Sequence, residues 1–149
     1  MTGTMRRAVT WTAALLIFGT ASYSLADLAI VTDEERIDSI IDDVASARHK
    51  GEALLRSVDL SRAPLEVSVG RDIEEFRSGD DDVLLGRAAE VDDQLGTGAL
   101  EVRQREITID GENAHVIVNL ARGDELIPCD LTLRRSGARW LIARLRVMG

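Results

Sequence analysis

The 149-residue sequence predicts an α+β fold in which N-terminal helices pack on an antiparallel β-sheet, preceded by an N-terminal apolar helix. Three patterns support this prediction. Apolar residues recur at helical spacing over residues 33–58 and 83–95, a period of two marks strands over residues 99–147, and residues 8–26 carry no charge. The length suits one folded domain with its own hydrophobic core.

Residues 1–31 are interpreted as an export signal or a single-pass membrane anchor. Arg6 and Arg7 precede the uncharged run and acidic residues follow it, as the positive-inside rule expects. Ser24 and Ala26 offer the small residues of a cleavage site, whereas 19 uncharged residues approach the ~20 that a spanning helix needs. The sequence leaves cleavage open. We expect residues 32–149 to lie in the periplasm or on the outer side of the cytoplasmic membrane.

A first helix is expected to begin after Thr32, because Thr32 and Glu35 have the spacing of a capping box. Its buried stripe is predicted to contain Ile37, Ile40, Ile41 and Val44. Basic residues then suit the negative end of the helix dipole, and Gly51 is expected to end the helix as a left-handed cap. His49 is therefore interpreted as part of a basic cap and not as a catalytic residue.

The middle of the chain predicts a second helix over residues 52–58, a loop over 59–64 and a strand over 65–69. Residues 71–77 fit either a return strand or a short helix. Three aspartates, Asp80, Asp81 and Asp82, precede a helical stripe that contains Val83, Leu84, Ala88, Val91 and Leu95. They are interpreted as first-turn carboxylates that favour the helix dipole, because consecutive aspartates lack the alternating spacing of a calcium loop.

The region from residue 99 to residue 147 predicts four antiparallel strands. Asp110-Gly111 is a strong hairpin signal, and Ser136-Gly137 marks the last turn. Leu100 and Val102 have one phase whereas Ile107 and Ile109 have the other, so a bulge or bend is expected around residues 103–106 to keep both pairs inside. The predicted inward face is apolar throughout and contains Val116, Val118, Leu120, Ile127, Cys129, Leu131, Leu133, Leu141, Leu145 and Val147.

Composition argues against several kinds of function. The chain has 26 acidic and 18 basic residues and a net charge of −8, so nucleic acid is a disfavoured partner. Its single cysteine, Cys129, can form no disulfide within the chain and is interpreted as a small buried apolar residue. No metal site, cofactor site or catalytic residue is predicted.

Three stretches, residues 50–55, 109–116 and 131–142, resemble the nuclear transport factor 2-like superfamily. The last of these ends in Gly137-Ala138-Arg139-Trp140-Leu141-Ile142. The resemblance covers residues 33 to 147 and implies a cone-shaped α+β fold with a curved sheet, shared by ketosteroid isomerase and scytalone dehydratase. One fold hosts many functions, so the resemblance implies no particular reaction.

The resemblance also implies where function would lie. Enzymes of this superfamily use carboxylates, histidines or tyrosines inside the cone, but the only tyrosine here, Tyr23, lies in the leader. His115 and Asn119 are expected on the outer face. The resemblance further implies a dimer contact on that face, where an apolar centre is predicted to contain Ile117, Trp140 and Ile142.

Two functions follow from these expectations. The first is a non-catalytic ligand- or protein-binding module, with a small apolar ligand or a second copy as partner and the membrane as a further contact if the leader is uncleaved. The alternative is a small-molecule isomerase, dehydratase or epoxide-hydrolase-like enzyme that uses a carboxylate at the pocket mouth. Asp72, Asp92 and Asp93 are the carboxylates considered for that role.

Overall fold

The computed structural model describes residues 31–148. The chain divides into two units, Met1–Asp33 and Glu34–Gly149, and the second is described here by itself. Its elements are α2 (Asp33–Ser46), α3 (Lys50–Leu55), β1 (Leu65–Val69), β2 (Asp72–Phe76), α4 (Asp81–Leu95), β3 (Glu101–Asp110), β4 (Asn113–Arg122), β5 (Glu125–Ser136) and β6 (Arg139–Val147). The predicted export signal or anchor lies outside the described residues, apart from Val31. Within residues 31–148 no helix has the length and apolar character needed to cross a membrane.

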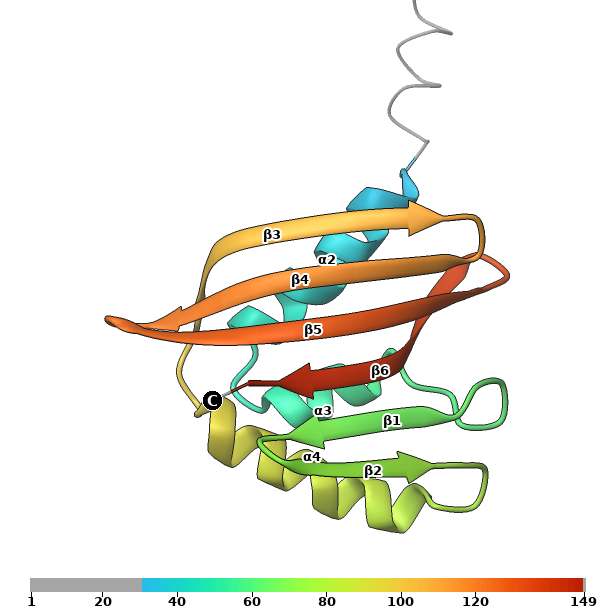
Figure 1. Ribbon diagram of the computed structural model, residues 1–149, viewed down its shortest axis with the longest axis horizontal. Helices are drawn as coiled ribbons and strands as arrows, with labels where there is room; N and C mark the ends of the chain where they lie inside the picture. Colours follow the sequence, from blue (N-terminus) through green and yellow to red (C-terminus); the bar gives the residue numbers. More distant parts are fainter. Residues whose placement is uncertain (1–30, 149) are drawn as a thin grey trace, which may run out of the picture. The chain divides into compact units, whose positions relative to one another are not determined.

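One six-stranded sheet organises the domain, in the order β2-β1-β6-β5-β4-β3 (Figure 1). The four predicted strands β3 to β6 pair as antiparallel neighbours. Residues 71–77 contain strand β2, which settles the choice that the sequence left open. The sheet is mixed, because β1 pairs with β6 in the parallel sense, with Val67 opposite Leu145. The predicted α+β class is confirmed.

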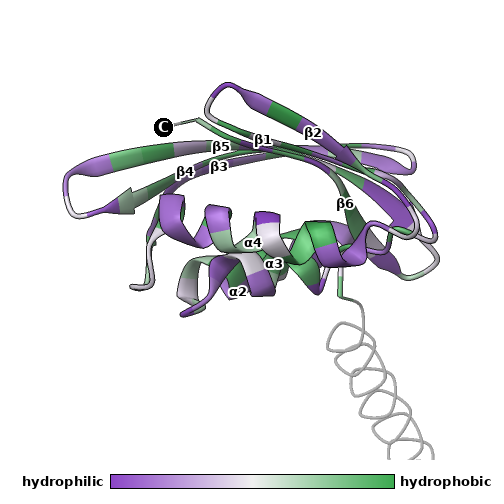
Figure 2. Cartoon of the chain, turned by 90° about the horizontal axis from the view of Figure 1, so that it is seen from below, coloured by the Kyte–Doolittle hydropathy of each residue, from purple (hydrophilic) through white to green (hydrophobic). Residues whose placement is uncertain are grey.

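All three helices lie against the same concave face of the curved sheet (Figure 2). The alternating strand residues fill the space between the two layers, and Ile37 of α2 and Val116 of β4 are fully buried there. The predicted inward residues of β4 and β5 all belong to this core. The period-two pattern therefore identified the buried face of these two strands correctly.

Two bulges set the phase of the side chains in β3 and β6. The first lies between Val102 and Gln104 of β3, inside the predicted interval, and it turns both Val102 and Ile107 toward the core. Ile109, which was also predicted inside, is 38% exposed. The second lies in β6, where Thr132 pairs with Arg144 but Leu133 pairs with Ile142, so Ala143 is the additional residue. An additional residue reverses the alternation of the side chains that follow it.

The second bulge corrects the predicted faces of β6. Trp140 and Ile142, predicted on the outer face, belong to the core and are 3% and 2% exposed. Leu141, predicted inward, is buried but lies outside the main core cluster. The strict alternation assumed from the sequence fails here because one residue of β6 has no partner on β5.

The helices also depart from prediction. The second helix, predicted over residues 52–58, is α3 at Lys50–Leu55. The last turn of α2 contains no basic residue, and His49, predicted as part of a basic cap there, is the N-cap residue of α3. Helix α2 ends at Ser46, and Gly51, expected as its left-handed cap, lies inside α3 and has no positive φ. At Gly51 a Cβ atom would lie 2.1 Å from the carbonyl oxygen of Ala88, so this glycine allows close packing of α3 on α4. In α4 the predicted buried stripe is wrong at Val83, which is 58% exposed. Asp81 and Asp82 do lie in its first turn, as expected.

Candidate functional site

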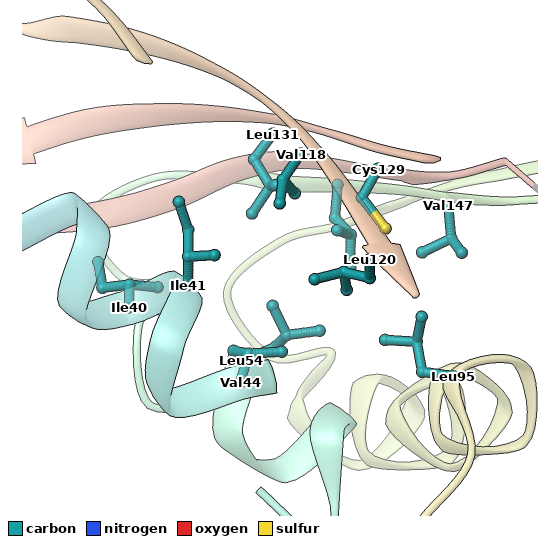
Figure 3. A pocket seen from close by; sticks show the side chains of 11 residues that line it. Ile40, Ile41, Val44, Leu54, Leu95, Val118, Leu120, Cys129, Leu131 and Val147 are labelled. Carbon is teal, nitrogen blue, oxygen red and sulfur yellow. The ribbon is translucent and has the colours of Figure 1, made fainter. Parts of the chain in front are cut away.

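The interior between helices and sheet holds a cavity of about 30 Å³ (Figure 3). Its lining is apolar on every side: Ile40, Ile41, Val44, Leu54, Leu95, Val118, Leu120, Cys129, Leu131, Leu145 and Val147. This volume is close to that of one or two water molecules, and a cavity with such a lining stays dry. The described interior at this point is a packing surface with a small void.

Cys129 is the ionisable residue of this cavity. Burial raises the pKa of its thiol to about 12, because the thiolate would lose its hydration inside the core. The Sγ atom faces the cavity (Figure 3), and its hydrogen-bond partner is the carbonyl oxygen of Ile127 at 3.8 Å. The thiol therefore stays protonated near neutral pH and is a poor nucleophile, which agrees with its interpretation as a small apolar residue.

A second void, of about 20 Å³, is lined by Arg87 among apolar residues of α3, α4, β1 and β6. The Arg87 guanidinium forms ion pairs with Glu90 and, at 3.7 Å, with Glu74 of β2. Its Nε and Nη2 atoms are buried and have no hydrogen-bond partner in the described part of the chain. Arg87 was not predicted to be buried, although its place three residues after Leu84 and four before Val91 puts it on the buried stripe.

Lys50 is a second buried cation that the sequence analysis missed. Its side chain is 0% exposed, and Nζ donates to the carbonyl oxygens of Ala47 and, at 2.7 Å, Gly98. Burial lowers the pKa of Lys50, whereas the nearby Asp92 carboxylate opposes this shift. Lys50 thus joins the end of α2 to the loop before β3. Because Lys50 follows Arg48 and His49, the sequence had suggested that it belongs to a basic, solvated helix end.

The carboxylates predicted for a pocket mouth do not line either void. Asp92 accepts a hydrogen bond from the Gly51 backbone N–H at 2.7 Å and lies 3.8 Å from His49 Nδ1, so it fixes α3 on α4. Asp72 begins the edge strand β2 and is exposed, and Asp93 is exposed on α4. The structure therefore brings none of the three to the interior cavity.

The outer sheet face is largely polar. His115 Nε2 lies 2.8 Å from Asp130 Oδ1, Arg144 pairs with Glu66 at 3.1 Å, and Asn119 is also on this face. Of the three residues predicted as an apolar interface centre, Ile117 alone lies here and is 40% exposed. Trp140 and Ile142 are in the core instead. The predicted apolar centre is therefore reduced to one side chain, and the homodimer stays a prediction that depends on Ile117.

A larger recess opens at the surface beside α4, and we call it the α3–α4 groove. Its volume is about 380 Å³, within the range typical of ligand pockets. It is lined by residues from the end of α3, the loop before β1, the start of α4 and the start of β6: Leu55, Val58, Asp59, Leu60, Ser61, Ser78, Asp81, Leu84, Leu85 and Arg139. Leu85 is 60% exposed here. Sequence periodicity did not identify this groove, because four separate segments form it.

The polar groups of the groove mostly have partners within the domain. Asp59 accepts hydrogen bonds from the Ser61 hydroxyl at 2.5 Å and the Ser61 N–H at 3.1 Å, and it lies 3.5 Å from Arg62. These contacts, the Ser61 hydroxyl first, lower the pKa of Asp59. Arg139 donates to the Arg56 carbonyl oxygen at 3.1 Å. The groove therefore combines hydrogen-bonded polar groups with three apolar side chains that reach the surface. These are Leu85, which is exposed, and Leu55 and Val58, which are partly exposed, and we call them the apolar wall.

No cluster of metal-ligating side chains occurs within residues 31–148. Searches with the sequence find no matching protein-family model and no similar curated protein. The fold, in contrast, has many structural relatives.

A putative ketosteroid isomerase from Parabacteroides distasonis has a TM-score of 0.57 at 14% identity, over 78% of this chain and 87% of its own. An NTF-2 like protein of unknown function from Shewanella oneidensis has a TM-score of 0.55 at 15% identity, over 79% and 100%. A de novo designed protein with a curved β-sheet has a TM-score of 0.54 at 15% identity, over 76% and 99%. The described domain thus has the nuclear transport factor 2-like fold that the sequence resemblance implied. At such identities the likeness shows the fold alone.

Proposed function

We propose that this chain is an exported, non-catalytic binding module that recognises its ligand or protein partner through the α3–α4 groove. The observation that carries this proposal is the apolar wall of the groove. Leu55, Val58 and Leu85 are all at least partly exposed, beside a recess of about 380 Å³. Exposed apolar side chains gathered in a concave site with a few polar groups are typical of recognition surfaces.

Two other recesses are less suited to binding a ligand. The interior cavity of about 30 Å³ is too small for any ligand larger than a few atoms, unless core side chains move. A recess of about 340 Å³ on the sheet is lined by Ala63, Pro64 and Ala143 together with charged or polar residues, and it has no large aliphatic side chain. The α3–α4 groove combines volume with leucine side chains, and this combination distinguishes it.

The enzyme alternative gains no support from the described residues. Neither interior void is lined by a carboxylate or a histidine. Asp59 in the groove has a lowered pKa, so it stays ionised and hydrogen-bonded near neutral pH instead of acting as a general acid. Asp81, the other carboxylate of the groove, is exposed in the first turn of α4. We therefore propose no reaction for this chain.

The export part of the proposal depends on the leader, where two arginines precede residues 8–26. Cell fractionation with N-terminal sequencing tests it. We expect either a chain that begins at Asp27 in the periplasm or an intact chain in the membrane fraction. An intact chain in the cytoplasm would contradict the proposal.

The binding part is tested with N-phenyl-1-naphthylamine, a neutral apolar fluorophore, and two matched variants of α4. Leu85 and Val83 have almost equal exposure, 60% and 58%, but only Leu85 lines the groove. We expect saturable binding to the unmodified chain, a strong loss in Leu85→Gln and no change in Val83→Gln. Equal binding by both variants, or no saturable binding at all, would contradict the proposal.

A further inference from the structure

We infer that the occupant of the α3–α4 groove is an extended protein segment in which an aliphatic or aromatic side chain is flanked by basic residues. This inference rests on the proposed function and adds the chemistry of the partner to it. Two features carry it: the apolar wall of the groove and the carboxylates at the start of α4 that are unpaired within the described residues.

The apolar part of the groove selects a side chain. Leu55, Val58, Leu84 and Leu85 give the recess of about 380 Å³ the apolar part of its lining. That volume is at the lower end of the range for ligand sites, so it holds a few side chains and not the face of a folded partner. An anchor residue of a linear segment suits such a recess.

The cations near the groove already have partners. Arg139 donates to a backbone carbonyl, and Arg62 pairs with Asp59 at 3.5 Å and donates to the Ser136 hydroxyl at 2.9 Å. Arg77, which precedes α4, pairs with Glu75 at 2.8 Å. The lining of the groove has one cation, Arg139, and two carboxylates, Asp59 and Asp81, so an acidic ligand is disfavoured.

The anions at the start of α4 differ from these cations. Asp80 accepts a hydrogen bond from the Arg77 N–H at 2.7 Å, whereas Asp81 and Asp82 have no ion pair or hydrogen-bonded side-chain partner within residues 31–148. Asp81 lines the groove. The positive end of the helix dipole offsets only about half a charge, so the rim remains negative. The whole chain, with a net charge of −8, adds to the attraction for a basic partner.

The probes are two synthetic peptides with the same apolar centre and opposite charge, acetyl-Gly-Lys-Lys-Leu-Phe-Lys-Lys-Gly-amide and the same peptide with Glu at each Lys position. Binding to the full chain is measured by fluorescence anisotropy at low and at high salt. Amide chemical shifts then locate the bound peptide. We expect the basic peptide to bind at least about tenfold more tightly at low salt and to shift amides around the groove.

Matched variants separate the apolar and the charged contributions. Leu85→Gln is expected to abolish peptide binding and Val83→Gln to preserve it. Asp81→Asn is expected to weaken binding about two- to fivefold, as for one exposed ion pair, and Asp93→Asn, at an exposed position near the other end of α4, to leave it unchanged. All four positions are exposed and none belongs to the core, so the variants should keep the fold.

Each outcome decides between the two proposals. Suppose that the fluorophore binds in a Leu85-dependent way. If the two peptides then bind equally, or if neither peptide binds, the inferred partner chemistry is wrong and the proposed function stands. If neither the fluorophore nor the basic peptide depends on Leu85, both proposals fail. Sedimentation that shows a dimer broken by Leu85→Gln would identify a second copy as the occupant and overturn the inference.

Discussion

Gly51 is the position where packing of α3 on α4 is most sharply tested. In Gly51→Ala the new Cβ would lie 2.1 Å from the Ala88 carbonyl oxygen, whereas Cβ atoms essentially never approach closer than 3.0 Å. The obstacle is backbone, so no side chain can rotate away. The two helices would have to separate by roughly 1 Å, which also strains the 2.7 Å hydrogen bond from Gly51 N–H to Asp92.

Two opposing effects set the size of the change. Replacing a helical glycine by alanine stabilises a helix by about 1 kcal/mol. Overpacking costs about 1–3 kcal/mol, and weakening a hydrogen bond to a charged group costs about 1.5–3 kcal/mol more. The overpacking and the weakened hydrogen bond outweigh the gain in helix propensity, so we expect Gly51→Ala to lower the free energy of unfolding by about 2–4 kcal/mol.

Gly86 supplies the matched control. It also lies inside a helix, α4, but a Cβ there would meet no atom within 4 Å. Gly86→Ala should therefore raise the free energy of unfolding by about 0.5–1 kcal/mol. Equilibrium urea unfolding of both variants, followed by circular dichroism, measures the difference. A Gly51→Ala variant as stable as the unmodified chain, or stabilised like Gly86→Ala, would refute the close packing of α3 on α4.

Three further predictions concern buried side chains. Trp140→Ala should lower the free energy of unfolding by about 3–5 kcal/mol at any protein concentration, because Trp140 is 3% exposed in the core. A loss below about 1 kcal/mol would show that Trp140 is not a core residue. Lys50→Met should be compared with the unmodified chain across pH. Because the folded-state pKa of Lys50 is lowered from 10.5, the penalty for its buried charge is fully present below the folded pKa and is relieved as pH rises toward 10.5. The unmodified chain should gain stability relative to Lys50→Met over that alkaline range, and a constant difference would exclude the lowered pKa. Cys129, with a pKa of about 12, should resist iodoacetamide at pH 8 in the folded chain and react after unfolding in urea; rapid labelling of the folded chain would contradict its burial.

Local patterns were sufficient for much of the fold. The alternation along β4 and β5 identified the buried face, and Asp110-Gly111 marked a hairpin that the structure contains. The opposite phases of Val102 and Ile107 located the bulge in β3. These features depend on neighbours within one strand or one turn, which is the range that periodicity reports.

The prediction failed where one residue changed the alternation. Nothing in the sequence near Ala143 signals a bulge, because its neighbours Ile142 and Arg144 fit either phase. Without that bulge Trp140 and Ile142 were assigned to the outer face, together with Ile117. The predicted interface centre was therefore a consequence of an unrecognised register shift.

The sequence by itself determined the fold class, the strand order of the meander and the absence of an acid or base from the inward face of β4 and β5. The tertiary structure decided which residues meet across separate elements. Lys50 is a buried cation because the loop before β3 covers it and accepts its hydrogen bond at Gly98. Gly51 is a helix contact because the backbone of α4 at Ala88 packs directly against it. The α3–α4 groove is formed by four segments far apart in the chain, and long-range packing of this kind leaves no local period to detect.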